Sequence, residues 1–213
     1  MKSSLRAFSF YLFLLFNTHL SASLEDYYPY QLSPSSSNYG DTGLLEMPSA
    51  RFMGAGGLKF GISASYPNEY TFIVASPFPW LEAGYRYTEQ KTEKYGPFAY
   101  SGNQTLKDKG FDIKIRVLEE SFYLPNVAIG IRDMGGTGLF SGEYLVGSKK
   151  FGFLDLSMGI GWGMLAADSN IRNPLISLDE RFGIRSSELQ QGGVFNLGDW
   201  FSGGRSALFG GIE

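Results

Sequence analysis

The sequence has 213 residues, with 18 Lys and Arg against 21 Asp and Glu, a formal net charge of −3. A mildly acidic chain has no overall attraction to nucleic acid, so we expect no nucleic-acid partner. The absence of cysteine excludes disulfides and thiolate metal sites. The one histidine, His19, lies near the N-terminus, inside a segment that we expect to be removed. We therefore expect neither an enzyme built on a Ser-His pair nor a bound cofactor or metal.

The N-terminus predicts export. Lys2 and Arg6 precede an apolar run of ten residues from Ala7 to Phe16, and small or polar residues follow up to Ser23. This order is typical of a secretory signal peptide, which we place at residues 1–23. A membrane-spanning helix would need roughly twice that apolar length. Because the sequence has no cysteine for lipid attachment, we also expect that the protein is not a lipoprotein.

Residues 24–57 carry no regular pattern, and from Leu58 onward apolar and polar side chains alternate. Alternation with a period of two places one face of a β-strand against an apolar phase and the other against a polar one. An eighth strand is expected to begin near Ser206. The seven clearer strands are predicted at residues 58–65, 70–74, 81–88, 111–118, 127–132, 143–149 and 154–163.

The lengths of these strands and of their connections favour a membrane barrel. Strands of about eight to eleven residues suit a bilayer crossing. Short and long connections alternate along the chain, and the long ones are expected at residues 89–106, 134–141 and 164–204. Aromatic residues such as Trp80, Tyr123 and Trp162 fall near strand ends, as in an interfacial girdle.

We therefore predict an all-β fold, an antiparallel outer-membrane-type β-barrel over residues 58–213. A soluble β-sandwich, whose strands alternate equally well, is the alternative. The last strand has only eight residues from Ser206, whereas a barrel must close its edges. We expect the chain to be an N-terminal portion of a longer barrel.

Several segments of the sequence occur together, in the same order, in one known family. They are residues 40–51 (GDTGLLEMPSAR), 77–83 (PFPWLEA), 107–114 (KDKGFDIK), 118–121 (LEES), 130–141 (GIRDMGGTGLFS) and 143–146 (EYLV). Through these segments the chain resembles the YjbH family over about residues 38–163. The resemblance implies an outer-membrane barrel that acts in exopolysaccharide or capsule assembly or secretion, without a known enzymatic activity. The implied partners are membrane lipid, polysaccharide and other envelope export proteins.

The charged residues on the polar faces of the predicted strands are the candidate contacts to a glycan in the barrel lumen. The alternative is that these residues only solvate that face or pair across strands. Two other functions stay open, a general porin or structural barrel and a soluble periplasmic carbohydrate-binding protein. The candidate lumen residues are Glu82, Arg86, Asp112, Lys114, Arg116, Arg132 and Glu143.

Overall fold

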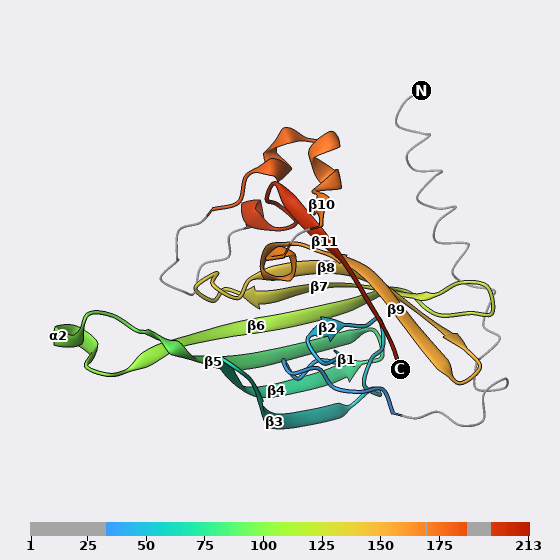
Figure 1. Ribbon diagram of the computed structural model, residues 1–213. Coiled ribbons are helices and arrows are strands. Elements are labelled where there is room, and N and C mark those ends of the chain that lie inside the picture. The colour runs from blue at the N-terminus through green and yellow to red at the C-terminus, as the bar shows by residue number, and fades with distance from the viewer. Residues whose placement is uncertain (1–32, 169, 187–196) are drawn as a thin grey trace.

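The computed structural model describes residues 33–168, 170–186 and 197–213. The predicted signal peptide, residues 1–23, lies outside the described residues. Nine strands form one antiparallel sheet in the order β10-β11-β9-β8-β7-β6-β5-β4-β3 (Figure 1). The predicted all-β antiparallel architecture is confirmed. None of the helices within the described ranges is long and apolar enough to cross a membrane.

The eight long strands follow the predicted alternation closely. Consecutive strands from β3 to β9 are neighbours, so this part of the sheet is a simple meander. The strands are β3 (Gly57–Ser65), β4 (Asn68–Phe78), β5 (Leu81–Lys94), β6 (Thr105–Leu118), β7 (Asn126–Met134), β8 (Gly142–Phe151), β9 (Leu154–Gly161) and β11 (Arg205–Ile212), with the short β10 (Ile171–Arg172) at one edge.

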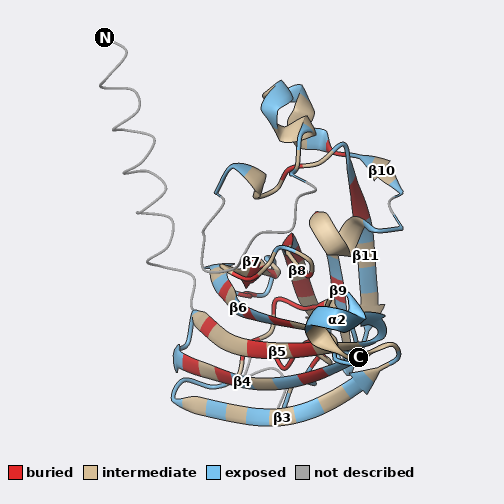
Figure 2. Ribbon diagram, turned by 90° about the vertical axis from the view of Figure 1, so that its left-hand side faces the viewer, coloured by how far each residue is buried: buried red, intermediate tan, exposed pale blue. Residues whose placement is uncertain are grey.

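The sheet curls strongly. Figure 2 shows β3, β4, β5 and β6 one above another, β7 and β8 above them, and β9 and β11 turned to run steeply along the right-hand side. Irregularities in register occur along β4–β5, β5–β6 and β6–β7, and bulges of this kind bend strands and increase their twist. Among the described residues no backbone pairing joins β3 to β11 or β10, so the structure shows a curled sheet and not a closed barrel.

Glycines on the inner, concave face let large side chains lie against the sheet. A Cβ atom at Gly130 would stand 2.2 Å from the Tyr144 ring, and one at Gly159 would stand 2.4 Å from the Phe209 ring. Neither distance is compatible with a larger residue. These contacts account for the glycine at each of the two positions, one on β7 and one on β9.

Two expectations about strands need correction. The predicted loop at residues 89–106 is partly strand, because β5 continues to Lys94 and β6 begins at Thr105, and the two are paired there. Its tip carries the short helix α2 (Phe98–Ser101) and projects beyond the rest of the sheet (Figure 1). In a barrel strand the apolar face is expected to point outward, but in β4 the apolar side chains Tyr70 and Val74 face the interior, with 1% and 3% of their surface exposed.

The segment between β9 and β11 is irregular, as expected. It contains the 3-10 helices η2 (Gly163–Ala166), η3 (Pro174–Ser177), η4 (Glu180–Gly183) and η5 (Leu197–Asp199). Asn173 begins η3 with a cap: its side-chain oxygen accepts a hydrogen bond from the backbone N–H of Leu175. Residues 174–177 and 180–183 thus form two separate 3-10 turns.

Residues 33–56, here called the N-terminal segment, lie inside the curl of the sheet (Figure 1). Within this segment β1 (Gly43–Leu44) and β2 (Met47–Pro48) form a small hairpin. The sequence had suggested only an irregular stretch before the sheet. Its interior position makes it the main partner of the concave face.

Candidate functional site

Six of the seven predicted lumen residues lie on the concave face. Strand register places Glu82 opposite Lys114. Further along the same two strands, Asp112 stands opposite Gly84 and Arg86 opposite Gly110, so Arg86 and Asp112 are diagonal neighbours. Arg132 follows on β7, and Arg116 lies further along β6. The structure brings these side chains together around the N-terminal segment, which the sequence did not predict.

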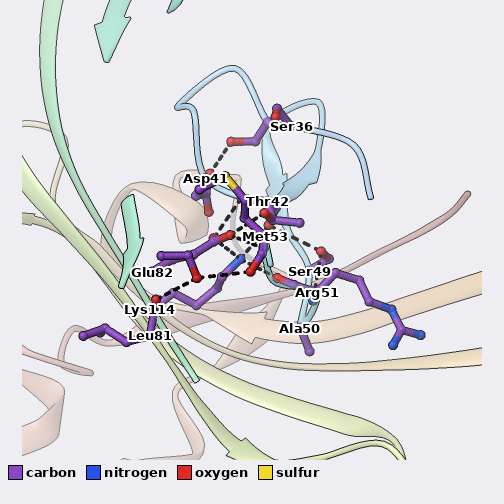
Figure 3. A network of polar contacts seen from close by, with 12 residues as sticks. Ser36, Asp41, Thr42, Ser49, Ala50, Arg51, Met53, Leu81, Glu82 and Lys114 are labelled. Atoms are coloured by element: carbon purple, nitrogen blue, oxygen red, sulfur yellow. Dashed lines mark hydrogen bonds and ion pairs between the residues drawn. The ribbon is translucent and has the colours of Figure 1, made fainter. Parts of the chain in front are cut away.

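Glu82 and Lys114 form the centre of this arrangement (Figure 3). Their side chains pair at 2.7 Å and are 1% and 2% exposed. The Glu82 carboxylate accepts hydrogen bonds from the backbone N–H of Thr42 at 3.1 Å and of Met53 at 2.7 Å. The Lys114 ammonium donates to the carbonyl oxygens of Thr42 and Arg51 at 2.8 and 2.7 Å. A buried ion pair thus satisfies backbone groups of the N-terminal segment.

Arg86 is held mainly by other residues on the concave face of the sheet, here called the wall. Its guanidinium donates to both oxygens of Asp112 at 2.9 and 3.2 Å and to the Thr88 hydroxyl at 3.0 Å. The ring of Tyr39, from the N-terminal segment, lies 5.0 Å from the guanidinium carbon. This stacking is the geometry of a cation–π contact.

Arg132 contacts the N-terminal segment more directly. Its guanidinium carbon stands 4.0 Å from the centre of the Tyr39 ring, and its Nη2 lies 3.4 Å from the Asp41 carboxylate. Burial acts to raise the pKa of Asp41, but the positive charges of Arg132 and Lys114 outweigh it, and the net shift is below the usual value of 3.8. Asp41 therefore binds as a carboxylate.

Arg116 lies at the margin of the site. Its guanidinium carbon is 4.8 Å from the Phe52 ring centre, and it pairs with Glu119 at 3.2 Å. The Glu119 side chain is 79% exposed. A pair so exposed contributes little to stability.

Residues 49–53 of the N-terminal segment make the firmest contacts with the sheet. Arg51 donates to both oxygens of Asp155 at 2.7 and 2.8 Å and also pairs with Glu120. Burial acts to lower the pKa of Arg51, but its hydrogen bonds to the two carboxylates raise it. Ala50 and Phe52 pack with the wall residues Ala128, Tyr144 and Val146 in the apolar core.

Glu143 is the one predicted residue that lies elsewhere. It stands opposite Ile131 in the β7–β8 register, on the outer, convex face, because neighbouring residues point to opposite sides of a strand. The segment after β9 buries it completely: Arg185 donates to both carboxylate oxygens at 2.8 and 3.0 Å, and the Phe201 N–H donates at 2.9 Å. The polar-face assignment of Glu143 is wrong. The alternation in β8 led to this error because the inner face of the strand carries the apolar residues Tyr144 and Val146, whereas a polar inner face was expected.

The space left at the site is small. A cavity of about 10 Å³ remains between the segment and the wall, lined by residues that include Asp41, Glu82, Lys114 and Arg132. That volume is about enough for one water molecule. Across the described part of the chain, no group of three or more His, Cys, Asp or Glu is arranged to hold a metal ion. The arrangement can recognise hydroxyl, amide and carboxylate groups through hydrogen bonds and charge.

Sequence reasoning missed the residues that fill the site, namely Asp41, Thr42 and Arg51. No strand periodicity marks them, because they belong to a turn and to extended backbone. The available signal was the segment at residues 40–51, which contributed to the family resemblance without any structural role being assigned to it.

Comparisons with known proteins agree with that resemblance. A family model named YjbH and described as "Exopolysaccharide biosynthesis protein YbjH" matches residues 35–213. A protein of Escherichia coli (strain K12) named "Uncharacterized lipoprotein YjbH" is 44% identical over 187 residues, which are 87% of this chain and 27% of that protein. The chain thus spans about a quarter of that relative's length. No solved structure matches.

The relative's name corrects one expectation. Because the sequence has no cysteine, we expected a protein that is not a lipoprotein. A relative with 44% identity is named a lipoprotein, which contradicts that expectation. Cysteine content was too weak a criterion to decide this point.

Proposed function

This chain belongs to the YjbH family of exopolysaccharide biosynthesis proteins, and on that premise we propose that its curled sheet forms part of the wall of an outer-membrane-type β-barrel. In this proposal the barrel takes part in the assembly or secretion of exopolysaccharide or capsule. The chain covers 27% of the E. coli relative, so the proposal concerns what this portion contributes.

The observation that carries the proposal is the apolar convex face. Phe60 and Ile62 on β3 are 83% and 79% exposed, and Met158 on β9 is 74% exposed. A soluble protein rarely exposes so continuous an apolar surface, whereas a barrel wall requires it where lipid chains cover the sheet. The other large apolar side chains exposed on this face are Leu58, Ile73, Phe111, Ile115, Leu145, Leu154, Leu156, Leu208 and Ile212.

Aromatic side chains at one end of the strands support the same proposal. The β4–β5 turn carries Phe78 and Trp80, whose rings stack at 5.4 Å. The β6–β7 connection carries Phe122 and Tyr123, and the β8–β9 turn carries Phe153, which is 90% exposed. Amphipathic rings concentrated at one level are typical of the membrane–water boundary.

The filled concave face favours a dedicated role over a general porin. A porin keeps a water-filled passage along its lumen, but here the N-terminal segment occupies the interior, and the cavity beside Glu82, Lys114 and Arg132 measures only about 10 Å³. The concave-face groups would contact a hydrated glycan through hydrogen bonds and charge. We expect no enzymatic activity from them, and other envelope export proteins are the expected partners.

The test is deletion of the gene in its native organism. We expect surface polysaccharide to fall, with unchanged permeability to small solutes, and restoration when the full-length gene is returned. Normal polysaccharide together with altered uptake of small solutes would overturn the proposal in favour of a porin. Extraction of the protein without detergent, together with soluble periplasmic proteins, would instead support a soluble carbohydrate-binding protein.

A further inference from the structure

The N-terminal segment consists of two parts that contact the sheet in different ways. Residues 35–48, here called the hairpin part, contact it mainly through polar groups. Residues 49–53, here called the anchor part, combine the Arg51 ion pairs with the apolar packing of Ala50 and Phe52. We propose that the anchor part stays bound while the hairpin part leaves the concave face to open a path for glycan. This proposal rests on the proposed function.

The charges of the wall support such a movement because most of them do not need the hairpin part. Glu82 pairs with Lys114 at 2.7 Å, and Arg86 pairs with Asp112 at 2.9 Å, both within the sheet. Removing one partner of a buried pair is costly because it leaves an uncompensated charge. Departure of residues 35–48 would leave both ion pairs intact, and Glu82 and Lys114 would lose only their hydrogen bonds to Thr42 while keeping those to Met53 and Arg51.

Only one of the three ion pairs formed by Glu82, Arg86 and Arg132 would break, and it is the longest. Arg132 pairs with Asp41 at 3.4 Å, the longest of the three concave-face pairs. The Nε atom of Arg132 is buried and has no hydrogen-bond partner. Once the hairpin part has left, Arg132 and the Glu82–Lys114 pair would face the opened interior, where sugar hydroxyls or carboxylates can replace the lost contacts.

The hairpin part also contacts strands at both sides of the sheet, β3 and β11. On the β3 side, Ser36 accepts a hydrogen bond from Lys59 at 2.8 Å, and the Asn38 carbonyl accepts one from Ser63. On the β11 side, the Ser35 N–H donates to the Glu213 carboxylate at 3.0 Å. Ser35, Ser36 and Glu213 are exposed, so water can replace these bonds at little cost.

Movement is tested by labelling two matched thiols. The sequence has no cysteine, and Ser37 in the hairpin part and Ser49 in the anchor part are each 4% exposed. The hydrogen bonds of both hydroxyls stay within the N-terminal segment. Substitution of either serine therefore leaves the segment's polar contacts to the wall in place.

In the full chain in detergent, we expect Ser37→Cys to react with a maleimide roughly tenfold or more faster than Ser49→Cys, since local opening exposes residues to different degrees. Arg132→Gln removes the ion pair with Asp41 and should accelerate only the reaction at position 37. Equal rates at the two positions, or reaction only in denaturant, would overturn the proposal whatever the role of the protein in polysaccharide export.

Gating is tested in cells with a reversible lock. Ser36→Cys and Lys59→Cys would be joined by a short bis-thiosulfonate cross-linker, and the matched control joins Ser65→Cys to Asn68→Cys, a registered pair within β3 and β4. We expect the first cross-link alone to stop polysaccharide secretion, with recovery after reduction. Normal secretion with the lock closed would overturn the proposal, while a gene deletion that lowers polysaccharide would still support the proposed function.

Discussion

The two faces of the nine-stranded sheet are built from the same strands but differ in what covers them. On the convex face, large apolar side chains such as Phe60 and Met158 are left uncovered. On the concave face, charged side chains such as Glu82, Lys114 and Arg132 are almost completely buried. The usual rule for a soluble protein is thus reversed, with charge inside and apolar surface outside. The contrast indicates that the segment inside the curl stabilises the polar face, whereas the apolar face needs an apolar environment.

The largest expected effect comes from breaking the buried pair on the concave face. Lys114→Met leaves the Glu82 carboxylate without its ion-pair partner, and we expect a loss of about 3–5 kcal/mol of unfolding free energy. The control is Lys109→Met on the same strand, whose side chain is exposed and should change stability by about 0.5 kcal/mol at most. Denaturant unfolding of the full chain in detergent measures both, and similar losses would remove the distinction between the faces.

A charge placed on the convex face should have the next largest effect. Met158→Lys is expected to cost about 2–4 kcal/mol in a bilayer, as for a lysine near the middle of a barrel wall. Leu45→Lys is the matched control, because Leu45 is 76% exposed against 74% for Met158 but lies on the N-terminal segment. Folding titrations in liposomes compare the two variants. If both behave alike, exposure and not lipid contact explains the apolar face.

Acid should weaken the concave face through Asp41. The folded-state pKa of this group lies below its usual 3.8, so its contribution to stability is present above that value and is lost as pH falls through the lowered pKa. Asp41→Asn lacks this contribution. We expect the wild type to be more stable than Asp41→Asn at neutral pH and the difference to shrink below about pH 4. A difference that stays constant down to pH 2 would contradict the assigned ion pair with Arg132.

The smallest effect is expected at the margin of the concave face. Glu119→Gln removes the exposed partner of Arg116, and we expect a change of at most about 1 kcal/mol in unfolding free energy. The same denaturant titration measures it. A loss as large as that of Lys114→Met would mean that Arg116 belongs to the buried network.

Alternation in the sequence was sufficient to predict the strands and most of the faces. Glu82, Arg86, Asp112, Lys114, Arg116 and Arg132 lie on the concave face because their strands keep a period of two. The same reasoning misplaced Glu143 and the apolar side of β4, because there the interior is itself apolar and holds Tyr70, Val74 and Tyr144. Periodicity identifies the residues that share a face but not what covers that face.

The N-terminal segment could not be predicted by local rules. Its contacts join residues far apart in the chain, such as Ala50 with Ser148 and Arg51 with Asp155. Its hairpin includes Leu45 with a φ of 49°, a left-handed conformation that leucine rarely adopts. Only the extended similarity of residues 40–51 to a known family marked this segment as distinctive.

The most direct test of the central claim is a spin label at position 158 on the convex face, compared with one at position 37 in the N-terminal segment. The full chain would be reconstituted in liposomes, and collisions of each label with oxygen and with a water-soluble nickel chelate would be measured. The account predicts that the label at position 158 meets oxygen and is protected from nickel, because lipid covers it. It predicts that the label at position 37 does not show this lipid signature. Strong nickel contact at position 158 would contradict the account, because the convex face would then lie in water.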